Sequence, residues 1–355
     1  MSNKISRRDV LKAGVATAAA GAAGAATVFP KVASAAAGRT KMRWRMQTHW
    51  PTGVGYYKDV YVRFCDRVRA ATDGDLDITP LPPGAIVPTG DVLEALGRGL
   101  FEISLIWPAY WIGKIPVAGH VNGQLFSWET AAEMYGYFYD MGAIEIFREA
   151  YAEHGVRFVS PIPMSGLALY SRKPIVKLDD FKGFKVRSTG IAAQVFQKAG
   201  ATPVFFPGDE VYQALQTGVC DGAHWGSVSA AWDMKFQEVT QYIIMPYLAN
   251  INNGEIIMNN KKWDELPTDI KTIVEECAKT AGIDFLKWSG YNDLVDINKF
   301  QNEIKGKLSI MEPDAVAQMR KFSIEVVDEY SKKDPKYCGK AGDLLKEMMK
   351  MGGRI

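Results

Sequence analysis

The chain has 355 residues, with 42 lysines and arginines against 40 aspartates and glutamates. Charges this evenly balanced give no indication of nucleic acid or of an anionic membrane surface as a partner. The length suits one large domain or two ordinary ones.

The first 35 residues have the layout of an export signal. Residues 6–12 read SRRDVLK, an Ala/Gly-rich stretch follows to about Val28, and residues 33–35 read Ala-Ser-Ala, a small-x-small cleavage site. The stretch is too short and too weakly apolar to be a spanning helix, which needs about 20 apolar residues. The paired arginines favour the twin-arginine route. We therefore expect a periplasmic protein that is cleaved near Ala35, and we exclude residues 1–35 from the fold.

Strands and helices alternate along the chain that follows. Apolar patterning and turn residues predict strands at Met42–Gln47, Leu76–Leu81 and Phe101–Trp107, and helices at Tyr57–Ala71 and Val92–Leu96. Alternation of this kind implies a parallel sheet with helices outside it. The predicted fold class is α/β.

Two segments far apart in the chain resemble each other. Gly90–Glu102 and Gly208–Asp221 both run from an Asp through a helical Ala-Leu pair to a Gly, and then to an apolar residue and an acid. Tryptophans follow both segments. Recurrence by chance would explain a match this short, but two α/β lobes with equivalent strand ends facing each other would also explain it. A ligand cleft is expected between such strand ends.

The segment Leu178–Arg187 (LDDFKGFKVR) resembles the "DLKGLK-x-R" signature of the solute-binding proteins of TRAP transporters. The continuation strengthens the resemblance, through Ala199–Pro203 and Glu210–Gly218 and then Asp221-Gly222. Trp263–Pro267 resembles the later "W-x-x-LP" segment of the same family. The resemblance covers essentially the whole chain after the signal.

The resemblance implies a two-lobed periplasmic-binding-protein fold of the type II-like kind, with a hinged ligand cleft and long connecting strands and helix. Such a receptor hands an organic acid to the membrane subunits of a TRAP transporter, performs no chemistry and needs no cofactor. The implied segments are 36–162 with 251–295 for lobe I and 163–250 with 296–355 for lobe II, crossing near 161–163 and 248–252. Segments of this kind absorb hinge rotation.

Arg187 is the principal candidate for ligand binding. In the family the resemblance points to, the Arg that closes this motif pairs with the carboxylate of the ligand. A planar guanidinium matches a carboxylate with two parallel hydrogen bonds. Without the flanking motif, a surface arginine at a strand end would be the default interpretation.

One branch of the family, which binds 2-oxo acids through a metal ion, resembles this chain around Arg187 and Trp225. That branch carries a Glu ligand immediately before the Trp, where this chain has His224, and its Gln ligand has no counterpart near Met164–Leu167. Hard cations need several oxygen ligands. We therefore predict direct binding without a metal. His224 either donates a hydrogen bond to an anionic oxygen or packs against a backbone partner.

The remaining candidates stand at predicted strand ends or near the cleft. Aromatic residues often only pack, and this alternative stays open for each of them, with Tyr212 as helix packing and Asn252 as a solvated hinge residue. The further candidate ligand-binding residues are Trp107, Tyr110, Trp111, His49, Trp50, Tyr170, Tyr212 and Asn252.

Alternatives remain open at the level of function and assembly. An exported enzyme or the binding domain of a sensor would compete with the receptor, but no cofactor motif and no nucleophile with a recognisable base is found. The ligand is expected to be a monocarboxylate, a 2-oxo or hydroxy acid, or an aromatic acid.

The helical stretch 314–330 packs on its own lobe or on a second subunit, so we expect a monomer with a homodimer as alternative. Disulfide pairing stays undecided for Cys65, Cys220, Cys277 and Cys338.

Overall fold

One mixed sheet runs through the computed structural model, which describes residues 40–121 and 124–355. In this part of the chain the sheet has nine strands, eight of them in the order β2-β1-β3-β8-β4-β7-β5-β6, with β9 added beside β8. The export signal predicted at residues 1–35 lies outside the described residues.

The first end of the sheet contains three parallel strands. β1 (Met42–Thr48) lies between β2 (Leu76–Leu81) and β3 (Ile103–Ile106). The first two predicted strands agree with the bounds of β1 and β2 to within one residue, because alternating apolar residues are buried, as Trp44 and Met46 are in β1. The third, predicted at Phe101–Trp107, is shorter in the structure and is buried at every position. The connecting helical segments are η1 (Tyr57–Val62), α2 (Arg63–Ala71), η2 (Thr89–Asp91) and α3 (Val92–Gly97).

The other end repeats this arrangement. β5 (Lys185–Arg187) lies between β6 (Thr202–Val204) and β7 (Gly222–His224), again in parallel. The connecting segments are η5 (Leu178–Phe181), α7 (Gly190–Lys198), η6 (Gly208–Glu210), α8 (Val211–Gln216), α9 (Val228–Asp233) and η7 (Phe236–Glu238). The two resembling segments of the sequence therefore form the same unit twice, a 3-10 turn and a short helix before a strand. β1, β2 and β3 correspond to β5, β6 and β7.

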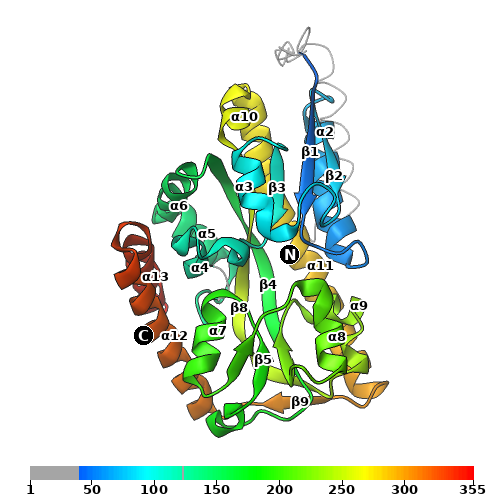
Figure 1. Ribbon diagram of the computed structural model, residues 1–355, viewed down its shortest axis with the longest axis vertical. Coiled ribbons are helices and arrows are strands. Elements are labelled where there is room, and N and C mark those ends of the chain that lie inside the picture. The colour runs from blue at the N-terminus through cyan, green and yellow to red at the C-terminus, as the bar shows by residue number, and fades with distance from the viewer. Residues whose placement is uncertain (1–39, 122–123) are drawn as a thin grey trace, which may run out of the picture. The chain divides into compact units, whose positions relative to one another are not determined.

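Two long antiparallel strands join these ends, β4 (Val156–Ser171) and β8 (Tyr242–Asn259) (Figure 1). β3 pairs with β8 and β7 with β4, both antiparallel, and β9 (Lys307–Ile310) runs parallel to the start of β8. Residues 161–163 on β4 are in register with 253–255 on β8, immediately beside the other implied crossing at 248–252. This is the two-lobed α/β architecture expected from the sequence.

Helices cover the sheet. Their bounds are η3 (Pro108–Trp111), α4 (Pro116–Val121), α5 (Ala131–Tyr135), η4 (Gly136–Asp140), α6 (Ala143–Ala152), α10 (Asn260–Glu265), α11 (Thr268–Asn302), α12 (Pro313–Lys333), η8 (Pro335–Gly339) and α13 (Lys340–Met351). α11 is continuous for 35 residues, so the implied lobe boundary at residue 295 falls inside it. Within the two described ranges, no helix is both long and apolar enough to span a bilayer.

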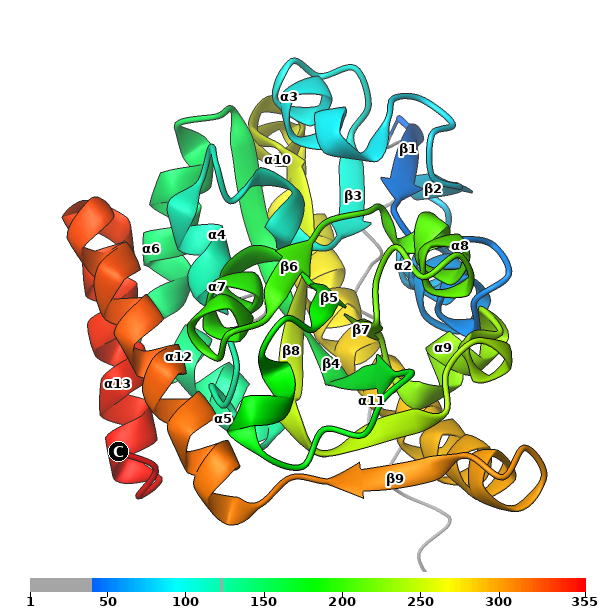
Figure 2. The same ribbon diagram turned by 60° about the horizontal axis from the view of Figure 1, so that its bottom comes forward.

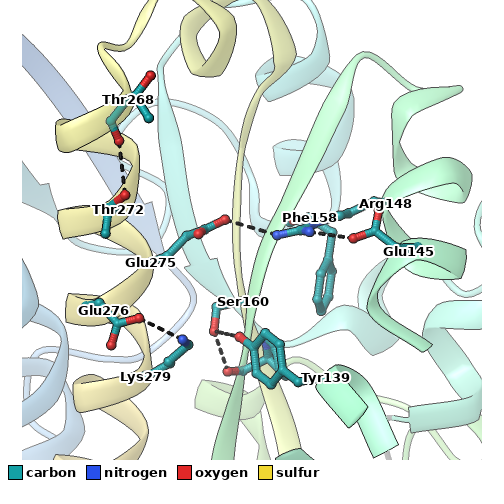
Figure 3. A network of polar contacts seen from close by, with 11 residues as sticks. Tyr139, Glu145, Arg148, Phe158, Ser160, Thr268, Thr272, Glu275, Glu276 and Lys279 are labelled. Carbon is teal, nitrogen blue, oxygen red and sulfur yellow. Dashed lines mark hydrogen bonds and ion pairs between the residues drawn. The ribbon is translucent and has the colours of Figure 1, made fainter. Parts of the chain in front are cut away.

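Polar contacts join α6 to α11, and join α6 and η4 to the first half of β4 (Figure 3). Arg148 on α6 forms an ion pair with Glu275 on α11 at 3.0 Å and donates to the carbonyl of Phe158 on β4. The hydroxyl groups of Tyr139 and Ser160 lie 3.0 Å apart. These contacts fix β4 just before the implied crossing at 161–163.

α12 packs on its own chain, beside α13 and against α7 (Figures 1 and 2). Met319 and Val326 are buried in a core cluster with Phe196 of α7, and Phe322 packs against that cluster. This was one of the two alternatives that the sequence left open for the stretch 314–330.

The four cysteines are all buried and none forms a disulfide. Cys65 and Cys277 lie in one apolar cluster and Cys220 and Cys338 in two others, and burial raises the pKa of each thiol. The described part of the chain is therefore held together without a disulfide cross-link.

Candidate functional site

A cavity lies where the carboxyl ends of β1, β3, β5 and β7 meet. Its volume is about 60 Å³. Seven of the predicted site residues line it, and these are His49, Trp50, Trp107, Tyr110, Arg187, His224 and Trp225. His49 follows β1 and Trp107 follows β3, while Arg187 and His224 end β5 and β7. Corresponding strand ends from the two repeated units thus form opposite sides of one cavity.

Arg187 is held in place by backbone carbonyl groups. Its Nε and Nη2 donate to the carbonyl of Phe206 at 3.2 and 3.0 Å, and its Nη1 donates to the carbonyl of His224 at 3.3 Å. A guanidinium has five N–H bonds. Three are used, so one N–H on each terminal nitrogen is left, which is the pair of donors that a carboxylate accepts.

No negative charge balances Arg187 within the cavity. The side chain is buried, at 5% exposure, and the residues that line the cavity include no aspartate or glutamate. Burial lowers the pKa of Arg187 to about 10, so the group is still a cation at neutral pH. A buried cation without a counter-ion is costly, and an anionic ligand would remove that cost.

Two histidines accompany Arg187. The Nδ1 of His49 and the Nε2 of His224 are buried and have no hydrogen-bond partner among the described residues. Burial, and secondarily the charge of Arg187, lower the pKa of both imidazoles to about 3. Both rings are therefore neutral at physiological pH, and each carries one donor and one acceptor nitrogen.

Aromatic rings form the walls. Trp50 packs against Tyr56, and Tyr110 meets His49 edge-on with ring centroids 5.7 Å apart. Trp225 packs on Phe236 at 5.0 Å. These contacts lock the rings before a ligand arrives, so the cavity is preformed.

Four predicted residues lie elsewhere. Trp111 points into the core and donates to the hydroxyl of Tyr151 at 3.0 Å, because the turn η3 places Tyr110 and Trp111 on different sides. Tyr170 is buried with its hydroxyl donating to the carbonyl of Ser227. Tyr212 donates to Glu238 on the outside of α8. Asn252 is buried on β8, opposite Met164, and is not a solvated residue.

The sequence did not point to several residues of the cavity. They are Pro51, Val54, Tyr56, Met164, Leu167, Thr189, Gly208 and Gly226. Gly208 could have been found, because it opens the second of the two resembling segments. Tyr56 had no such signal, since its hydroxyl forms a hydrogen bond with Ser227, 171 positions later.

Contacts across the cavity join the two repeated units. The backbone N–H of Gly55 donates to Asp233 at 3.0 Å, beside the bond between Tyr56 and Ser227. Ser229 donates to Asp293 of α11 at 2.7 Å through its hydroxyl. The loop after β1 is thereby bonded to both ends of α9.

A preformed, largely apolar cavity with one uncompensated cation, set between two α/β units, defines the class of a solute-binding protein. The model of the DctP family, described as bacterial extracellular solute-binding protein family 7, matches residues 46–334. The chain belongs to this family, whose members are the solute-binding proteins of TRAP transporters.

Similar proteins are known by sequence and by structure. The chain is 26% identical over 332 residues to the monocarboxylate 2-oxoacid-binding periplasmic protein of a Nostoc species, covering 92% of this chain and 90% of that one. A TRAP solute-binding protein of Pseudoalteromonas atlantica, solved with sodium and pyruvate, has a TM-score of 0.80 at 24% identity, over 88% and 95% of the two chains. One from Colwellia psychrerythraea, solved with calcium and pyruvate, has a TM-score of 0.80 at 21% identity, over 87% and 94%.

Proposed function

We propose that this protein is the receptor that captures a small monocarboxylic acid in the periplasm for the membrane subunits of a TRAP transporter. The carboxylate pairs with the two remaining N–H groups of Arg187, and the aromatic walls enclose the rest of the ligand. The observation that carries the proposal is the buried charge of Arg187, whose side chain is held in a prepared geometry and has no counter-ion among the described residues that line the cavity.

The relatives support the choice of ligand. The Nostoc relative is a binding protein for monocarboxylate 2-oxo acids, and two structural neighbours hold pyruvate. A single cation in the cavity suits one carboxylate better than two. A cavity of about 60 Å³ admits a handful of water-sized groups, at ~10–15 Å³ each. The relatives, the single cation and the cavity volume together favour a short acid of roughly three to five carbons.

The lobes of the proposed receptor are residues 36–162 with 251–295 and 163–250 with 296–355. The chain would pass between the lobes on β4 near 161–163 and on β8 near 248–252. Rotation would occur at these two places, with α11 bending alongside. In the structure described here the two sides of the cavity are bonded to each other through Gly55 and Asp233. This bond supports the interpretation that the cavity is in a closed state. Opening the cavity would break few polar contacts.

Arg187→Ala tests the proposal. Binding of pyruvate, lactate and other short acids is measured by calorimetry and by thermal shift, where a ligand at 100 times its Kd stabilises the fold by about 2.7 kcal/mol. The variant should lose both signals, with an affinity loss of about 100-fold or more, because a hydrogen-bonded charge pair is removed. Arg187→Lys, which keeps the charge but loses the fork, should give an intermediate loss.

Stability of the unliganded variant should not fall, because removing a buried, unpaired cation relieves a desolvation cost. Arg43→Ala is the matched control, since Arg43 is exposed and pairs with Asp77 on the surface of β1 and β2. Undiminished acid binding by Arg187→Ala would refute the proposed function.

A further inference from the structure

The cavity does not offer the ligands that a sodium or calcium ion requires. Structural neighbours hold such a cation together with pyruvate. The side chains that line this cavity include no carboxylate and no carboxamide, and their oxygen atoms belong to tyrosines and Thr189. Hard cations bind six to eight oxygens or keep several waters, roughly, and prefer carboxylates. Arg187 adds a positive charge that repels a second cation.

Met164 and Leu167 line the cavity with apolar side chains. Among residues 40–121 and 124–355, no group of three or more His, Cys, Asp or Glu side chains is arranged to hold a metal. Apart from Arg187, the tryptophan N–H groups and the hydroxyl groups, the polar side-chain atoms of the cavity are the imidazole nitrogens of His49 and His224.

Two imidazoles from opposite sides of the cavity fill this gap. His49 follows β1 and His224 ends β7, so one comes from each repeated unit. Both carry a buried ring nitrogen without a partner among the described residues, Nδ1 in His49 and Nε2 in His224. An unmet buried donor or acceptor costs about 1–3 kcal/mol, so a ligand atom that satisfies either nitrogen gains that amount.

We propose that His49 and His224 replace the cation and bind the oxygen on the carbon next to the ligand carboxylate, so that this receptor selects 2-oxo or 2-hydroxy acids without any metal. The inference rests on the proposed function, because it takes the carboxylate to be held by Arg187. The carboxylate and the neighbouring oxygen of such an acid point in similar directions. Arg187 donates to the backbone carbonyl of His224, so the two anchors on this side are held next to each other.

Neutral imidazoles suit this role. The desolvated site keeps both rings uncharged at neutral pH, with pKa values lowered to about 3. An N–H of a neutral ring donates to a keto oxygen, and either ring can donate to or accept from a hydroxyl group. A ligand without an oxygen on the carbon next to its carboxylate would leave these ring nitrogens without a hydrogen bond. A site of this kind discriminates strongly against such a ligand in favour of 2-oxo and 2-hydroxy acids.

The test compares pyruvate, lactate and propionate by calorimetry, with chelator-treated protein in sodium-free buffer. Pyruvate or lactate should bind about tenfold or more tightly than propionate, the value of one hydrogen bond. Adding sodium or calcium ions should leave the affinity for pyruvate unchanged. His224→Leu and His49→Leu should each weaken pyruvate binding by about tenfold while changing propionate binding by no more than about threefold.

His154→Ala is the matched control, because His154 is an exposed histidine outside the cavity, and it should behave as the wild type. If a leucine variant fails to fold, His224→Gln provides a second measurement, since its amide can still donate and should retain most of the discrimination.

Three results would overturn the inference. Pyruvate binding that disappears without sodium or calcium and returns with either ion would show that a cation is needed, while the proposed function would stand. Restoration by zinc alone would identify the imidazoles as metal ligands. Equal affinities for pyruvate and propionate would remove the role of the second oxygen. Failure of every acid to bind, or binding that ignores Arg187→Ala, would instead contradict the proposed function.

Discussion

At the residue scale, the site is defined by the charge of Arg187. Backbone carbonyl groups hold this side chain in position but do not neutralise its charge. Two carbonyl groups orient Arg187, and no carboxylate in the cavity lowers its cost of burial. The sequence motif identified this residue, but only the packing around it shows that the charge is buried and uncompensated. A surface arginine with the same neighbours in sequence would have no such need for an anion.

The pH dependence of binding follows from three groups in the cavity. The pKa of Arg187 is lowered only to about 10, so it stays charged below that pH. The pKa values of His49 and His224 are lowered to about 3, so both rings stay neutral above it. The affinity for pyruvate should therefore be constant between about pH 6 and 8, and should fall above about pH 10 as Arg187 loses its proton. A change of about tenfold or more between pH 6 and 8 would contradict these assignments.

Gly208 limits the size of the cavity. A Cβ at this position would lie 3.0 Å from Nε1 of Trp225, closer than side chains normally approach. Gly208→Ala should therefore push the indole into the cavity and weaken the binding of longer 2-oxo acids more than that of pyruvate, by about two- to tenfold.

Calorimetry with a series of acids of increasing chain length measures the effect of Gly208→Ala. The control is Gly90→Ala, at the corresponding position of the first repeated unit, where a Cβ meets nothing within 4 Å. Equal losses for short and long acids would show that Gly208 does not set the size limit.

At the element scale, the repeated units place their strand ends against each other, and loops then bond across the cavity. The loop after β1 is joined to α9 through Gly55 and Asp233, and through Tyr56 and Ser227. The segments that form this junction are far apart in the sequence and carry no motif. Because they bond the two repeated units to each other, we expect them to act on the balance between open and closed forms.

Asp233→Ala tests this junction. The variant leaves the N–H of Gly55 without its acceptor in the closed form, so ligand affinity should fall by about two- to tenfold and the ligand should dissociate faster. Asp233→Asn keeps an oxygen acceptor and should stay close to the wild type. Glu238→Ala is a matched control, because Glu238 accepts from Tyr212 without crossing the cavity. Unchanged dissociation kinetics in Asp233→Ala would show that the junction does not hold the closed form.

At the scale of the whole molecule, stability depends on keeping buried histidines neutral. His120 is fully buried, with neither ring nitrogen bonded among the described residues, and packs edge-on against Tyr330. Burial lowers its pKa to about 4, while Asp334 acts to raise it and Lys346 to lower it. Below about pH 6.5 the unfolded chain binds a proton here that the folded chain does not, so stability is lost as the pH falls.

His120→Leu removes this titration. Between pH 7 and pH 5 the wild type should lose about 2 kcal/mol more unfolding free energy than the variant does. Denaturant unfolding at the two pH values measures the difference. Parallel losses in His120→Leu and the wild type would show that His120 does not titrate on unfolding.

The sequence alone determined the family, the alternation of strands and helices, and most residues at the strand ends. These features depend on local periodicity, turn residues and a motif that is contiguous in the chain. The bounds of β2 could be predicted to the residue because its buried side chains alternate and a turn precedes it. The correspondence between Gly90 and Gly208 also indicated two related units before their strands were seen to pair in the same order.

Only the tertiary structure decided which of these residues share a cavity. Tyr110 faces it and Trp111 faces the core because of the direction of a single turn, which the composition of the segment does not encode. Tyr56 enters the site through a partner 171 positions away. The neutrality of His49 and His224 and the missing counter-ion of Arg187 arise from burial among distant segments. Burial is a property of packing between elements, and no local pattern in the chain determines it.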